Sequence, residues 1–303
     1  MEIRNKMADQ NFAEVKFTLR NGIKMPAVGL GTFRIRDPAV VYSAVDSALA
    51  VGYRLFDTAA VYQNERFLGD ALRDLLPKYG LQRSDIYVTT KLSPSDQSAE
   101  LVPKAFSKSL ENLGLQYIDL YLIHFPGAAR INSSDPKNEA LRNETWNAIT
   151  KLYDTGKVKA IGVSNFTVRH LRQLQKSSTI EPMVNQVEWH PHYYESDLLE
   201  YCNTHNIRLQ AYCSFGGQAI RNNSLMEDPV VRDISAKHNA TPAQVLLTWA
   251  LQRGIAVIPK SVTPQRIKEN IQLSMRMSPE ELSLLDSLRN NGLKYAWDPN
   301  PIA

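Results

Sequence analysis

The chain has 303 residues, a length that suits one large domain or two ordinary ones. Hydrophobic residues make up 43% and charged residues 22%, an ordinary globular balance that predicts a packed core. The formal net charge of +4 is small and no basic block stands out, so we expect no nucleic-acid partner. No run reaches the roughly 18 uninterrupted apolar residues of a membrane span, so we expect no membrane partner either.

Two cysteines, Cys202 and Cys213, lie in apolar or amphipathic segments. They do not predict a disulfide framework, and a reducing compartment follows, so we expect a cytoplasmic protein. The polar start of the chain does not resemble a signal peptide, and we expect residues 1–14 to form a disordered leader. Next, Val15–Leu19 and Lys24–Met25 flank an Asn-Gly pair, which predicts a β-hairpin that covers the amino-terminal mouth of a barrel.

Short β-branched or aromatic runs then alternate with longer amphipathic segments, which is typical of parallel β/α units. The expected strands are Ala27–Leu30, Tyr53–Asp57, Ile86–Lys91, Ile118–His124, Val158–Ser164, Met183–Glu188, Arg208–Tyr212 and Ala256–Pro259. Helical patterns lie between them and after them, including Pro38–Val51, Ser98–Leu113, Asn138–Thr155, Asp197–His205 and Ser278–Leu288.

Eight such repeats in one unbroken series predict an α/β fold, a (β/α)8 TIM barrel with an amino-terminal hairpin and extra helices. A doubly wound sheet is less consistent with the sequence, because no G-x-G-x-x-G motif follows the first strand. No linker or composition break divides the chain, so we expect residues 1–303 to form a single domain.

Most of the expected strands end on a polar or ionisable side chain, at the face where barrel enzymes carry their active sites. These side chains are Asp57, Lys91, His124, Ser164, Asn165, Gln186, Glu188, Tyr212, Lys260 and Ser261, and Tyr62 follows in the loop after the second strand.

Four of these residues together suit the reduction of a carbonyl group. A phenol such as that of Tyr62 is a poor acid at neutral pH, and the ammonium of Lys91 would lower its pKa. The carboxylate of Asp57 would hold that ammonium in place. A neutral imidazole at His124 would donate a hydrogen bond to the carbonyl oxygen, so that the phenol protonates the oxygen as negative charge develops there.

The same residues lie in motifs that resemble those of the aldo-keto reductase family. The motifs are Gly52–Ala59 with Val61–Glu65, Asp119–His124, Gly162–Phe166, Asn185–Pro191, and Ile258–Thr263 followed by Arg266, Glu269 and Asn270. The resemblance runs from about residue 17 to residue 297 and implies an enzyme that reduces aldehydes and ketones with NADP(H). It assigns catalysis to Tyr62, Lys91, Asp57 and His124.

The resemblance also assigns the cofactor and substrate contacts. The nicotinamide carboxamide would be bound by Ser164, Asn165 and Gln186, and its ring would stack on Tyr212. The 2′-phosphate of NADPH would be held by Lys260, Ser261 and Arg266, and the adenine by Glu269 and Asn270. Other implied cofactor contacts are Thr32, Asp57, Val262 and Thr263. The implied substrate pocket comprises Phe33, Tyr62, His124 and Phe125.

The sequence departs from the family pattern at several places. Phe33 and Phe125 stand where many members have tryptophan. The loop Gly217–Met226 is short, which weakens the expectation of a tight cofactor clasp. The tail beyond Leu288 is also short, and we expect it to leave an open pocket with a broad substrate range.

Other interpretations of these residues are weaker. The H-x-H of His190 and His192 lacks a third ligand, so we expect no metal site. Asp57 and Glu188 would suit the carboxyl pair of a glycosidase, but that chemistry leaves the lysine and tyrosine without a role. Apolar neighbours around Cys213 favour an unreactive thiol.

The main alternative in function is a non-catalytic NADP(H)-binding regulatory or structural protein on the same scaffold. The complete set of Asp57, Tyr62, Lys91 and His124 favours the enzyme, because a structural descendant need not keep all four. The chain has no long exposed apolar segment, which favours a monomer, and a small carbonyl compound is the expected partner.

Overall fold

A computed structural model describes residues 11–289 and 293–303 of the chain. Its centre is an eight-stranded parallel sheet whose strands follow one another in chain order. The strands are β3 (Leu30–Gly31), β4 (Leu55–Asp57), β5 (Tyr87–Leu92), β6 (Ile118–Ile123), β7 (Val158–Ser164), β8 (Val184–Glu188), β9 (Arg208–Tyr212) and β10 (Ala256–Val257).

The sheet closes on itself next to β3. Val28 and Val257 form a parallel bridge, in which the Val257 amide donates to the Ala27 carbonyl at 2.8 Å and the Gly29 amide donates to the Val257 carbonyl at 2.9 Å. The predicted α/β barrel is therefore confirmed. The closing strands are shorter than the sequence predicts, since only Leu30–Gly31 and Ala256–Val257 form regular strands of the ladder.

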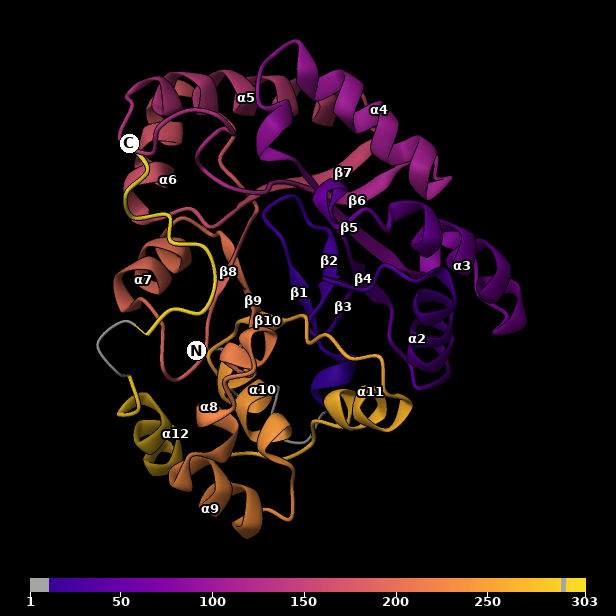
Figure 1. Ribbon diagram of the computed structural model, residues 1–303, viewed down its shortest axis with the longest axis vertical. Helices are drawn as coiled ribbons and strands as arrows, with labels where there is room; N and C mark the ends of the chain where they lie inside the picture. Colours follow the sequence, from indigo (N-terminus) through magenta and orange to yellow (C-terminus); the bar gives the residue numbers. More distant parts are fainter. Residues whose placement is uncertain (1–10, 290–292) are drawn as a thin grey trace.

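Helices form an outer layer around the strands (Figure 1). They are α2 (Pro38–Ala50), α3 (Glu65–Lys78), α4 (Leu101–Leu113), α5 (Lys137–Asp154), α6 (Val168–Ser177), α7 (Ser196–Thr204), α10 (Pro242–Gln252) and α11 (Pro264–Ile271). Three further helices are α8 (Ser224–Glu227), α9 (Pro229–Lys237) and α12 (Pro279–Asp286). The sequence predicts extra helices, and of these three it locates α12, within Ser278–Leu288.

The strands pack tightly because each buries both faces. Every residue of β5 and β6 is buried, between the barrel interior on one side and the helices on the other. At Gly162 in β7 a side chain would collide with the neighbouring strand, since a Cβ there would lie 2.4 Å from the Val184 carbonyl oxygen. The result is a rigid ring that holds the strand ends, and the side chains on them, in fixed positions.

The predicted hairpin is present and covers the amino-terminal mouth of the barrel. It consists of β1 (Lys16–Thr18) and β2 (Lys24–Pro26), paired antiparallel, with Gly22 in the turn at φ 85°. The Asn21 side-chain amide donates to the Lys159 carbonyl near the start of β7, and the Arg208 guanidinium at the start of β9 lies over the Phe17 ring.

Residues 11–14 correct the expectation of a disordered leader, whose first ten residues lie outside the described part of the chain. Phe12–Glu14 form a short 3-10 helix, and Phe12 is buried under the guanidinium of Arg276. The Phe12 amide also donates to the Leu273 carbonyl at 3.1 Å. The buried ring and this hydrogen bond hold the turn against the segment after α11, and the polar composition around Phe12 hid that signal.

Candidate active site

A buried ion pair lies at the carboxyl ends of β4 and β5. The Lys91 ammonium donates to Asp57 Oδ1 at 2.7 Å and to the Thr58 carbonyl at 2.8 Å, and it lies 3.4 Å from the Tyr62 hydroxyl. The side chains of Lys91 and Asp57 are 0% and 3% exposed. The structure thus brings three of the four candidate catalytic residues into direct contact.

The loop after β4 positions Tyr62. Residues Ala60–Tyr62 form a 3-10 turn, which ends at Gln63 in the left-handed conformation, φ 61°. Behind the turn the buried Asn64 amide donates to the carbonyls of Thr32 and Ile35 at 2.9 and 2.8 Å. The loop is therefore tied to the segment after β3, and the phenol has little freedom to leave the strand ends.

Burial dominates the protonation of this cluster. It raises the pKa of Tyr62 well above its usual value, and the nearby Asp57 carboxylate acts in the same direction. Burial therefore outweighs the expected lowering of that pKa by the ammonium. Lys91 is itself buried and engaged by Asp57, and burial lowers the pKa of Lys91. The phenol consequently stays protonated, which is the form that donates a proton.

His124 joins the cluster from the end of β6. Its ring packs edge-on against the Tyr62 ring, with centroids 5.6 Å apart, and the Phe33 ring lies 5.1 Å from Tyr62 on another side. Burial, together with the positive charge of Lys91, holds the pKa of His124 well below 6.5. The imidazole is neutral, as the sequence-based mechanism requires.

The four candidate nicotinamide contacts form one hydrogen-bonded chain across the ends of β7, β8 and β9. Gln186 donates to Asp57 Oδ2 at 2.8 Å, and Ser164 donates to the Gln186 carbonyl at 2.8 Å. Asn165, in the left-handed conformation at φ 66°, donates to the His124 carbonyl at 2.9 Å and accepts from the Tyr212 hydroxyl at 2.5 Å. This chain connects the candidate cofactor side of the barrel mouth to the buried ion pair.

The candidate phosphate and adenine contacts lie after β10 and on α11. Ser261 is buried and its hydroxyl accepts from the Thr263 amide, whereas Val262 is 40% exposed. Partial burial lowers the pKa of Lys260, and the neighbouring cation Arg34 lowers it further. The remaining candidate phosphate and adenine contacts lie on α11, where Arg266 is exposed and Asn270 is buried. The Glu269 carboxylate accepts a hydrogen bond from the Gln265 side-chain amide. Thr32, across the barrel seam, donates its hydroxyl to the Asp57 carbonyl at 2.8 Å.

The candidate substrate wall contains a residue that the sequence did not single out. The ring of Trp297, in the carboxy-terminal tail, lies 5.3 Å from the His124 ring and 5.6 Å from the Phe125 ring. The short tail thus places an aromatic ring beside this wall, and the open pocket with a broad substrate range stays a prediction. The two aromatic residues of the tail, Tyr295 and Trp297, were the available signal.

The residues set aside in the sequence have other partners. Glu188 binds the tail and His190, and His192 Nδ1 lies 2.9 Å from the Tyr295 hydroxyl. In the described part of the chain, no three His, Cys, Asp or Glu side chains gather as a metal site would require. Burial raises the pKa of the Cys213 thiol to about 12, which suits an unreactive cysteine.

Among the described helices, none is long and apolar enough to cross a membrane.

The comparisons with known proteins agree with this geometry. The family model described as "Aldo/keto reductase family" matches residues 27–290. The chain belongs to the aldo-keto reductase family. It is 42% identical over 284 residues to a 9,11-endoperoxide prostaglandin H2 reductase of Trypanosoma cruzi, covering 93% of this chain and 94% of the relative. It is 39% identical over 284 residues to the glyoxal reductase of Bacillus subtilis, covering 93% and 95%.

A solved structure supports the same conclusion for the fold. The crystal structure of an aldo-keto reductase from a Medee basin deep-sea metagenome library superimposes with a TM-score of 0.85 at 39% identity, covering 95% of this chain and 99% of that chain. The predicted family and the predicted carbonyl-reducing activity of this aldo-keto reductase are thus confirmed. The family is typically NADPH-dependent.

Proposed function

We propose that this aldo-keto reductase reduces aldehydes and ketones to alcohols with NADPH and that Tyr62 donates the proton. The observation that carries the proposal is the cluster in which the phenol of Tyr62 lies between the imidazole of His124 and the buried lysine–aspartate ion pair. Its members are Asp57, Tyr62, Lys91 and His124.

Each residue has a defined part in this reaction. NADPH, when bound, supplies the hydride. The Tyr62 hydroxyl donates its proton to the carbonyl oxygen as negative charge develops there. The Lys91 ammonium, 3.4 Å from that hydroxyl, stabilises the phenolate that remains, and Asp57 and the Thr58 carbonyl keep the ammonium in place. The neutral imidazole of His124 donates a hydrogen bond that orients the carbonyl oxygen.

The residues of this chain fit NADPH. Arg34 lies close enough to Lys260 to lower the pKa of that lysine, so this side of the barrel mouth carries positive charge that suits an anionic group. Arg266 lies in the first turn of α11, where no described side chain caps the helix. The backbone amides of that first turn therefore also suit a phosphate. The half-buried Tyr212 ring and the amides of Asn165 and Gln186 would hold the nicotinamide.

The experiment is NADPH oxidation against a panel of aldehydes and ketones, with NADH in parallel. Glyoxal belongs in the panel because one relative is a glyoxal reductase, and an endoperoxide belongs there because another is a prostaglandin H2 reductase. Turnover with NADPH well above NADH is the expected result. Tight NADPH binding without turnover of any carbonyl would contradict the proposal and favour a cofactor-binding regulatory or structural protein. A monomeric state and a cytoplasmic location stay predictions.

A further inference from the structure

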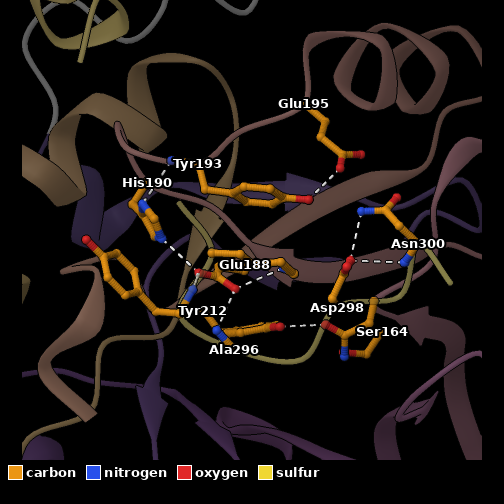
Figure 2. A network of polar contacts seen from close by, with 12 residues as sticks. Ser164, Glu188, His190, Tyr193, Glu195, Tyr212, Ala296, Asp298 and Asn300 are labelled. Carbon is orange, nitrogen blue, oxygen red and sulfur yellow. Dashed lines mark hydrogen bonds and ion pairs between the residues drawn. The ribbon is translucent and has the colours of Figure 1, made fainter. Parts of the chain in front are cut away.

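Glu188, at the end of β8, binds the carboxy-terminal tail through a buried carboxylate. Its side chain is 0% exposed, and four donors converge on its two oxygens (Figure 2). Oε1 accepts from the Tyr295 amide at 2.6 Å and lies 3.0 Å from His190 Nε2, and Oε2 accepts from the Lys294 ammonium at 2.9 Å and the Ala296 amide at 3.0 Å.

These contacts keep the carboxylate charged in spite of its burial. The hydrogen bond from His190 and the charge of Lys294 hold the pKa of Glu188 at about 2. Three of the four donors belong to consecutive tail residues, and two of those are backbone amides. Glu188 therefore fixes the path of the main chain there, independently of which side chains the tail carries.

Residues 294–296, held by Glu188, form an anchor for the tail, and the next residue forms part of the candidate substrate wall. Trp297 follows Ala296 directly and contacts the rings of His124 and Phe125. A shift of the backbone at residues 294–296 would therefore move the indole relative to the imidazole that orients the carbonyl oxygen.

Tyr295 connects the same anchor to the loop after β9, which follows the candidate nicotinamide contact Tyr212. Its hydroxyl lies 2.9 Å from His192 Nδ1 and 3.3 Å from the Ser224 hydroxyl. Its ring packs on Gly217, where an added Cβ would lie 2.6 Å from the Tyr295 ring. The anchored segment thus has the aromatic wall on one side and the loop beside the nicotinamide site on the other.

A second attachment holds the end of the tail on α5 and α6. The Ala303 amide donates to the Ser133 carbonyl at 2.8 Å, the Arg142 guanidinium donates to the Ala303 carbonyl at 3.0 Å, and His170 Nε2 lies 3.0 Å from the Ile302 carbonyl. Trp297 therefore lies on a span that is fastened at both ends. Loss of the Glu188 anchor would loosen this span without releasing the tail altogether.

We propose that Glu188 is a positioning residue that sets both the aromatic wall at His124 and the loop after Tyr212 by holding residues 294–296. The proposal rests on the proposed function, because it concerns binding of a carbonyl substrate and of NADPH. It gives the buried carboxylate of β8 a role in substrate selection and cofactor retention, with no contact to either ligand.

The test uses Glu188→Gln, which keeps the shape but replaces one acceptor oxygen with an NH2 group that cannot accept from the tail. Loss of a charge-assisted hydrogen bond predicts a rise of about tenfold or more in KM for a bulky aromatic aldehyde and in the dissociation constant of NADPH. The kcat for a small aliphatic aldehyde should stay within about twofold, because the catalytic cluster is untouched.

Tryptophan fluorescence reports on the position of the tail without an activity measurement. Trp146, Trp189 and Trp249 are 0–1% exposed, whereas Trp297 is 49% exposed, so a Trp297→Phe variant identifies its contribution to the emission. Quenching of that component by acrylamide should increase in Glu188→Gln. The matched control is Glu200→Gln, on the exposed surface of α7, and it should change none of these quantities.

Trp297→Ala separates the effect on the substrate wall from the effect on the loop beside the nicotinamide site. It should raise KM for the bulky aldehyde and leave NADPH affinity within about twofold, because the contacts of Trp297 are aromatic ones on the substrate side. Lys294→Met, which removes a single donor, serves if Glu188→Gln does not fold. Unchanged quenching, KM and NADPH affinity in a folded anchor variant would overturn the proposal. So would an equal loss of kcat for small and bulky aldehydes, which would mark Glu188 as a general stability residue. Failure of the proposed function would instead appear as absent turnover in the unaltered protein, while the quenching experiment still reports on the anchor.

Discussion

Replacement of Tyr62 by phenylalanine separates catalysis from folding most cleanly. Among the described residues the Tyr62 hydroxyl has one hydrogen-bond partner, the Lys91 ammonium at 3.4 Å, near the long limit for a hydrogen bond. Its loss should cost at most about 0.5–1 kcal/mol of unfolding free energy. Loss of general acid catalysis should instead raise the reaction barrier by about 2.7–5.5 kcal/mol, which corresponds to a roughly 10²- to 10⁴-fold lower kcat/KM.

The assay compares NADPH oxidation with a small aldehyde and urea unfolding for the same preparations. Tyr121→Phe is the matched control, because the Tyr121 hydroxyl is buried without a described hydrogen-bond partner and the Tyr121 ring packs beside Phe106. The control should keep full activity and equal or higher stability. Tyr62→Phe with more than about a tenth of the original kcat/KM would refute the assignment of the proton donor.

Three further predictions follow from the same geometry. Lys91→Met should abolish turnover and lower the urea-unfolding free energy by about 3–5 kcal/mol, because it leaves the Asp57 carboxylate buried without its cation. Unchanged stability would mean that Asp57 is already neutral. Arg266→Ala should raise the dissociation constant of NADPH by roughly 10- to 100-fold and that of NADH by less than about twofold, by fluorescence titration; equal losses would remove the 2′-phosphate assignment. Burial lowers the pKa of His170 from 6.5 to about 4, so the unfolded chain binds more protons between these values. Unfolding free energy should therefore fall by up to about 3 kcal/mol as the pH drops through this window, and the fall should be smaller in His170→Gln; equal falls in both proteins would assign it to other groups.

The sequence predicted the barrel because its dominant signal is local. Strands such as Val158–Ser164 and Arg208–Tyr212 are apolar or β-branched runs with clear ends, and the structure begins and ends them at the same residues. The closing strands were predicted too long, because their pairing depends on where the ring meets itself. That position is set by the whole barrel and leaves no mark in the local pattern.

The candidate site was accessible from the sequence only where side-chain chemistry is local to a strand end. The polar ends of β4, β5 and β6 indicated Asp57, Lys91 and His124, but the sequence did not show that burial would raise the pKa of Tyr62 overall. Desolvation depends on what surrounds the phenol in three dimensions, and that information is absent from the spacing. The contact of Trp297 with His124 joins residues far apart in the chain, and the Glu188 anchor acts through backbone amides that any sequence would supply.

The short seam between β3 and β10 gives the barrel a built-in weak line. Regular pairing stops at Leu30–Gly31 and Ala256–Val257, and one bridge and a few amide bonds complete the ring. Local opening begins where few backbone hydrogen bonds hold neighbouring strands, and three of the described ones cross this seam, so the closed cylinder can open along it. Thr32 and Lys260 follow the two seam strands on opposite sides. A dinucleotide bound to both Thr32 and Lys260 would connect the two sides of the seam. The unfolding free energy of the barrel would then rise with the concentration of that dinucleotide.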